Sequence, residues 1–112
     1  MNVYQPALEG ETITGEGKWT TAVTAAQIAA AAVVVKAAPG RLCKVLVTTT
    51  TTTSEAITIY DNASTASGTV IAVIPGDTSA GTVIDFQMPC NNGITIEQNA
   101  SLVAGAITIS WV

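Results

Sequence analysis

The stretch LCKVLVTTTTTTSEAITIYD, residues 42–61, decides the fold of this chain. Apolar residues alternate with other residues in both halves of the stretch, and the regularly spaced ones are Cys43, Val45, Val47, Ile57 and Ile59. Successive residues of a strand point to opposite faces of a sheet, so a period of two indicates β-structure. β-branched residues, which favour strands, dominate both halves. We therefore expect strands over residues 42–51 and 55–61.

Outward from this stretch, six further segments have the composition of strands and are separated by turn-forming residues. They cover residues 19–24, 31–37, 69–74, 82–88, 93–97 and 104–112, with turns rich in Gly, Pro, Asn and Asp between them. The segment between the first two is expected to be a loop or short turn. Residues 69–74, apolar on both faces, are expected to form a central strand. The triplet Ile-Thr-Ile recurs at 57–59, 94–96 and 107–109, and we expect its Ile side chains in the core and its Thr side chains outside.

About eight short strands at spacings of roughly 8–12 residues are typical of an antiparallel β-sandwich or jelly roll. The 112 residues are enough for one core. The sequence therefore predicts an all-β protein with a single sandwich domain over residues 19–112. Residues 1–18 lack any sustained period and contain three of the eight acids and three glycines, so we expect an extended N-terminal arm.

Charge is scarce on this chain. Only 11% of its residues are charged, against about 25% in an ordinary soluble domain, while 48% are hydrophobic. This composition excludes a disordered chain and favours a subunit whose surface is covered in an assembly. Four Lys and Arg against eight Asp and Glu give a net charge of −4, so we expect no nucleic-acid partner. The absence of an export signal and of a long apolar run predicts synthesis in a cytoplasm and no membrane partner.

The chain has little material for catalysis. It contains no His, no nucleophile elbow and no phosphate-binding loop, so we expect no enzyme activity, no metal site and no cofactor. Cys43 and Cys90 are expected to be buried, unpaired thiols. The six-Thr run at 48–53 allows an ice-binding or glycan-bearing array, but we favour the stiffened tip of a hairpin.

Part of the chain resembles small β-rich structural proteins of tailed bacteriophages. The resemblance covers about half of the chain and rests on turn and strand residues: Lys36 to Leu42, Tyr60 to Ser64, Ser67 to Ala72, Ile74-Pro75, Met88-Pro89 and Asn92 to Ile94. It implies a virion component assembled in the host cytoplasm. Proteins of this kind include head decoration (cement) proteins and tail or fibre attachment domains.

We expect a decoration protein that binds the outer surface of the head as a homotrimer, with the major capsid protein and further copies of itself as partners. The residues expected at these interfaces are Val3, Tyr4, Leu8 and Trp19 as anchors of the arm, and Arg41 and Lys44 as partners of acids on a neighbour. Two alternatives stay open at this point. One is a tail-fibre or head-fibre attachment domain, and the other is a carbohydrate-binding module on the virion surface that uses its Trp side chains.

Overall fold

The computed structural model describes residues 18–51, 55–100 and 105–112. Val3, Tyr4, Leu8 and most of the expected arm lie outside the described residues. In chain order the elements are β2 (Trp19–Thr24), α1 (Ala25–Ala30), β3 (Val33–Lys36), β4 (Gly40–Thr49), β5 (Ile57–Asp61), β6 (Thr69–Ile74), β7 (Val83–Cys90), β8 (Ile94–Ile96) and β9 (Ala106–Trp111).

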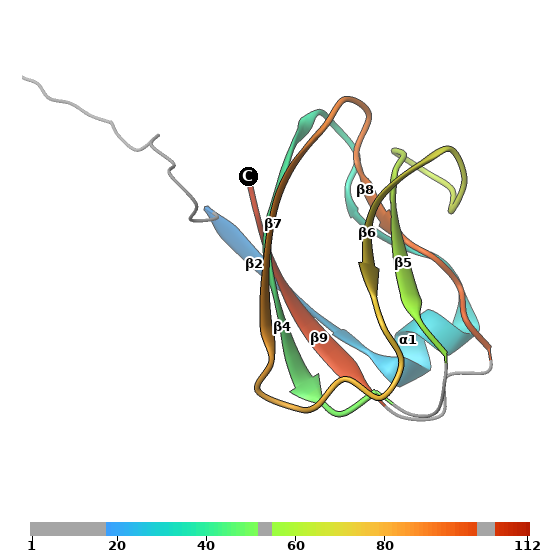
Figure 1. Cartoon of the computed structure of the whole chain (residues 1–112). Helices are drawn as coiled ribbons and strands as arrows, with labels where there is room; N and C mark the ends of the chain where they lie inside the picture. The colour runs from blue at the N-terminus through green and yellow to red at the C-terminus, as the bar shows by residue number, and fades with distance from the viewer. Residues whose placement is uncertain (1–17, 52–54, 101–104) are drawn as a thin grey trace, which may run out of the picture.

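The strands form two four-stranded antiparallel sheets packed face to face (Figure 1). One sheet has the order β2-β9-β4-β7 and the other the order β3-β8-β5-β6. The first described strand pairs with the last, β3 with β8, β4 with β7, and β5 with β6. This nested pairing is that of a long antiparallel hairpin rolled into two sheets, which is the jelly roll. The all-β sandwich of about eight strands is thus confirmed, and the pairing identifies which kind it is.

The core lies between the sheets and is built mainly from Ile and Val. Its fully buried members include Val23, Ile28, Leu42, Val45, Val47, Ile57, Ile59, Ile74, Ile94, Ile96, Ile107 and Ile109. Phe86 and Trp111 pack against this cluster and remain partly exposed. Burial of β-branched side chains in preferred rotamers fills the space between two pleated surfaces without large aromatic residues.

A β-bulge changes the predicted faces of β4. Leu42 pairs with Trp111 but Lys44 pairs with Ser110, so β4 has one more residue than β9 over this interval. β7 is bulged at the same level, with one more residue than β4 between Met88 and Asp85. Gln87, in the bulge, has a φ of 51°. Leu42 and Cys43 are both buried as a result, although they were expected on opposite faces.

The segment between β2 and β3 is a helix rather than the expected loop. Thr24 caps α1: its hydroxyl accepts the Gln27 N–H at 3.3 Å, and the Gln27 side chain accepts the Thr24 N–H at 2.8 Å. This reciprocal arrangement is a capping box, in which Gln serves as well as Glu. Ile28 points from the helix into the core, so tertiary burial adds to the helix propensity of the Ala residues around it.

Three further expectations about the strands were wrong. β6 is an edge strand rather than a central one, because it has a neighbour on one side only. β4 and β5 belong to different sheets, so they do not form the expected hairpin. The six-Thr run begins within β4, and residues 52–54 lie outside the described part. Thr95 is fully buried, unlike the outward Thr of the other Ile-Thr-Ile triplets, and its hydroxyl donates to the carbonyl of Asn62 at 2.7 Å.

The two ends of the sandwich carry different connections, visible at the top and bottom of Figure 1. We call the end where β2 begins and β9 finishes the tryptophan end; it also holds the turns at 37–39, 62–68 and 91–93. We call the opposite end the helix end. It holds α1 and the connections around Thr51, Thr78 and Asn99.

Candidate interaction surfaces

Both tryptophans lie in one cross-strand row at the tryptophan end. Trp19 pairs with Trp111, Trp111 with Leu42, and Leu42 with Met88, so the row crosses all four strands of its sheet. The two indole rings are 6.2 Å apart between centroids and tilted by 35°. The Trp111 indole N–H donates to Thr21 Oγ1 at 3.0 Å. Trp19 remains 52% exposed, which leaves one aromatic face of the pair available to another molecule.

Two lysines lie against these rings. Lys18 Nζ is 5.5 Å from the centroid of Trp19, and Lys36 Nζ is 5.2 Å from that of Trp111. Lys36 reaches Trp111 from the opposite sheet. Both distances fall within the range of cation–π attraction, which is worth about 0.5–1 kcal/mol at an exposed site. The aromatic pair is thus flanked by a positive charge on each side.

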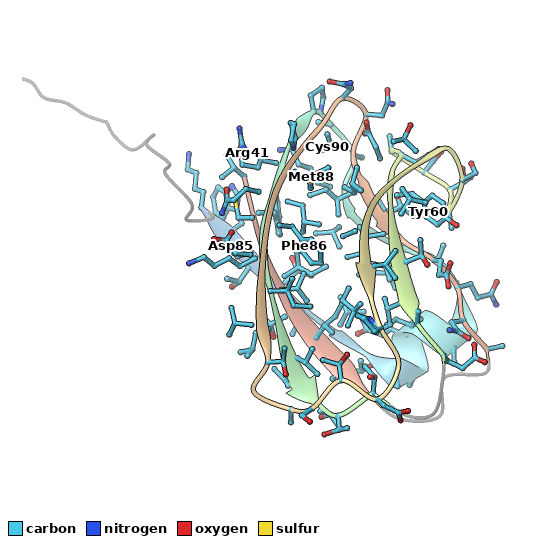
Figure 2. All side chains as sticks on the ribbon, viewed as in Figure 1. Arg41, Tyr60, Asp85, Phe86, Met88 and Cys90 are labelled. Carbon is cyan, nitrogen blue, oxygen red and sulfur yellow. The ribbon has the colours of Figure 1, made fainter. Side chains whose placement is uncertain are left out.

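Arg41 and Lys44 complete a group of cations at this end. Arg41 exchanges both backbone hydrogen bonds with Val112, at 3.1 and 3.0 Å, and its guanidinium donates to the carbonyl of Gln87 at 3.1 Å. Lys44 pairs in register with Asp85 on β7. Figure 2 shows Arg41 near the end of the chain, and Asp85 and Phe86 on opposite sides of β7. Of the expected interface residues, the structure therefore brings together Trp19, Arg41 and Lys44, and it adds Lys18 and Lys36.

Asp61 connects two turns of the tryptophan end. Its carboxylate accepts the backbone N–H groups of Asn91, Asn92 and Gly93 at 3.0, 2.8 and 3.2 Å. The hydrogen bond from Asn91, followed by those from Asn92 and Gly93, lowers the pKa of this carboxyl group despite an opposing effect of burial. The adjacent Asn62 accepts the N–H groups of Ser64 and Thr65 in the turn role expected of it. Both residues serve the fold, as their turn context predicts.

The two cysteines are free and buried, as expected. Burial is the largest influence on both thiols, and it raises the pKa of Cys43 and of Cys90. A protonated thiol is neither a good nucleophile nor a metal ligand. Among residues 18–51, 55–100 and 105–112, no group of three or more His, Cys, Asp or Glu side chains could hold a metal ion. No helix within these ranges is long and apolar enough to cross a membrane.

The outer face of the sheet β3-β8-β5-β6 is a second candidate surface. Register places Val34, Thr95, Tyr60 and Val70 in one row across its four strands, and Thr58 and Val73 in the next row. Val34, Val70 and Val73 are 42%, 47% and 46% exposed. None of these six residues is charged, and Tyr60 is labelled on this sheet in Figure 2. The sequence does not reveal this surface, because the alternation of exposed and buried residues is broken by register shifts at both edge strands.

The chain was compared with protein-family models, with curated proteins and with solved structures, and nothing matched in any of the three comparisons.

Proposed function

We propose that this protein is a structural subunit of a tailed-bacteriophage virion, a decoration protein that binds the outer surface of the head as a homotrimer and stabilises the shell. The uncharged outer face of the sheet β3-β8-β5-β6 supports this role most directly. Val34, Val70 and Val73 are exposed on the two edge strands of this sheet, and a subunit packed against its neighbours would cover such apolar side chains. The resemblance of residues 36–94 to phage structural proteins supports the same role.

The mechanism is mechanical. The sandwich is a rigid platform, since its core is continuous and its turns are held by side-chain hydrogen bonds. Residues 1–8 carry Val3, Tyr4 and Leu8 and no charged side chain. They reach the major capsid protein, while the sandwich rests on the shell. Several weak contacts made by one oligomer act together, because the first contact raises the effective concentration of the others.

Binding to isolated phage heads tests this role. The triple variant V3S/Y4S/L8S removes the apolar side chains of residues 1–8, and N2S/Q5S changes two polar side chains of the same segment as a matched control. We expect the control to co-sediment with heads as the wild type does and the triple variant to remain in the supernatant. Equal decoration by both variants would show that these residues are not the capsid anchors.

Copy number separates the alternatives. A decoration protein is present at hundreds of copies per virion, whereas a fibre attachment domain is present at a handful. A carbohydrate-binding module would instead bind glycans and lose that binding on Trp19→Ala. Quantitative mass spectrometry of purified virions that finds the chain absent from heads would reject the decoration role.

A further inference from the structure

All four cations of the sequence lie at the tryptophan end, and none of them forms an ion pair with another residue of the described ranges. Lys18 precedes β2, Lys36 ends β3, Arg41 is the second residue of β4, and Lys44 lies midway along β4, beside Ser110 of β9 and Asp85 of β7. The register Trp19–Trp111–Leu42 puts Lys18 and Arg41 on either side of β9, two strand spacings or roughly 10 Å apart. The protein has a net charge of −4, but its Lys and Arg side chains all lie toward one end of the fold.

The negative charges near these cations do not neutralise them. Asp61 is engaged by three backbone N–H groups, and Asp85 accepts a hydrogen bond from Gln87 at 2.7 Å. Among the side chains described, these two negative charges face four positive ones. Glu55, Asp77 and Glu97 belong to the helix end, where no cation of the described residues is present. The tryptophan end therefore attracts an acidic partner, and the exposed Trp19 offers it an apolar contact.

The segment that precedes Lys18 has the complementary chemistry. Glu9, Glu11 and Glu16 are all of the acids in residues 1–17, and they alternate with Gly10, Thr12, Ile13 and other uncharged residues. Residues 9–17 can span at most about 30 Å when extended, which exceeds the roughly 19 Å width of a four-stranded sheet. The segment is therefore long enough to cross the tryptophan end of an adjacent molecule.

Geometry at Lys18 favours a neighbouring copy over the same chain. The Lys18 N–H donates to the Trp111 carbonyl at 2.9 Å, which continues the pairing of β2 with β9 to this residue. The chain at this point is aligned with the strand and directed beyond the end of the sheet. On β4, Arg41 lies level with Lys18, two strands away, and Lys44 lies behind that exit. For residues 9–16 to reach Arg41 or Lys44 of the same molecule, the chain would have to change direction directly before Lys18.

We propose that the acidic segment at residues 9–16 of one copy binds the tryptophan end of a neighbouring copy, where its carboxylates pair with Lys18, Lys36, Arg41 and Lys44. Each contact joins two different surfaces, and such contacts close into a ring when the rotation between neighbouring copies allows it, which is the arrangement that the expected homotrimer requires. Residues 1–8 remain available for the shell. This association does not require a phage head, so it can succeed or fail independently of the decoration role.

Sedimentation velocity of the full-length protein gives the first test. We expect oligomers at low salt whose association weakens at least about tenfold when sodium chloride rises from roughly 0.02 to 0.5 M, because exposed charge pairs are screened. A protein that is monomeric at low salt, or an oligomer insensitive to salt, would overturn the proposal.

Charge-reversal variants identify the two partners. E9K/E11K reverses two charges of the acidic segment, and K18E/R41E reverses two charges of the tryptophan end. E55K/E97K is a control at the helix end that changes the net charge by the same amount as E9K/E11K. We expect the first two variants to be monomeric and the control to associate as the wild type does. Circular dichroism and thermal unfolding confirm that each variant is folded. Loss of association in the control alone would show that the helix end is the true partner.

Mixing the two reversed variants distinguishes exchange between copies from contact within one chain. A tagged E9K/E11K protein should retain untagged K18E/R41E, since the reversed segment of the first now matches the reversed end of the second. Neither variant should retain its own untagged form. Failure of the two variants to form a complex would show that the segment does not pass between copies and would overturn the proposal.

Discussion

The two ends of the sandwich are held by different chemistry. At the tryptophan end, the Asp61 carboxylate binds three backbone N–H groups and Lys36 lies over an indole ring from the opposite sheet. At the helix end, hydrogen bonds between uncharged groups hold the connections together. Thr51 Oγ1 donates to the Pro75 carbonyl at 3.3 Å and accepts the Thr78 N–H at 2.8 Å.

Other neutral contacts strengthen the helix end. The Asn99 side chain donates to the Ala56 carbonyl at 3.1 Å, and the Asn99 backbone N–H donates to the Ile28 carbonyl at 3.1 Å. Charged hydrogen bonds are stronger than neutral ones but depend on pH and salt. The Asn99 side chain also donates to the Glu55 carboxylate, at the longer distance of 3.5 Å. The comparison therefore predicts that the tryptophan end responds to pH and salt more strongly than the helix end.

The largest effect is expected from Gly93→Ala at the tryptophan end. A Cβ atom at this position would lie 2.4 Å from the Lys36 carbonyl oxygen and 2.8 Å from that of Asn62, both backbone atoms that cannot move aside. We expect a loss of about 3 kcal/mol or more in the free energy of unfolding. Urea denaturation measures it.

Gly81→Ala, near the helix end, is the control for Gly93→Ala. Gly81 has a φ of +91° but no atom within 4 Å of an added Cβ, so only backbone strain of about 1–2 kcal/mol is expected. An equal loss in the two variants would mean that the turn at 91–93 is not tightly packed.

Asp61→Asn and Thr51→Val compare the two ends directly. The first substitution replaces a charged acceptor of three N–H groups and should lower the free energy of unfolding by about 2 kcal/mol. The second removes one neutral hydroxyl and should lower it by about 1 kcal/mol. Chemical denaturation at pH 7 measures both. A larger loss for Thr51→Val would reverse the ranking of the two ends.

The pH dependence of stability sharpens this comparison. The pKa of Asp61 lies below its ordinary value of 3.8 in the folded protein, so its carboxylate stabilises the fold above that value. This contribution is lost as the pH falls through about 4 and below. We expect the difference in stability between wild type and Asp61→Asn to shrink over this range, while that between wild type and Thr51→Val stays constant. A constant gap for Asp61→Asn down to the lowest pH would contradict the assignment.

The smallest effect is expected from Gln27→Ala at the helix end. This change removes the side chain that accepts the Thr24 N–H, one half of the capping box. Because α1 has only six residues and is also held by Ile28, we expect a loss of about 0.5 kcal/mol. Gln27→Glu, which restores the acceptor, should recover the wild-type midpoint. No recovery would indicate that α1 is held by burial alone.

Local patterns in the sequence were sufficient for the strands but not for their arrangement. The alternation of Ile57 and Ile59 with Thr58 and Tyr60 is a property of adjacent residues, so it predicted β5 well. The capping box Thr24–Gln27 is equally local, but the expected loop or short turn at this segment did not include it. The role of residues 69–74 was not local: an apolar segment is suited to a central strand, but β6 lies at an edge where Val70 and Val73 stay exposed.

The sequence by itself determined the all-β class, the positions of most strands, the buried thiols and the shortage of charge, because each depends on composition or on neighbours along the chain. Only the tertiary structure decided that β4 and β5 belong to different sheets, that Asp61 binds the turn at 91–93, and that Lys18 and Lys36 join Arg41 at one end. Asp61 bonds residues 30 to 32 positions farther along the chain, and the chain closes such distant contacts only when the whole core forms.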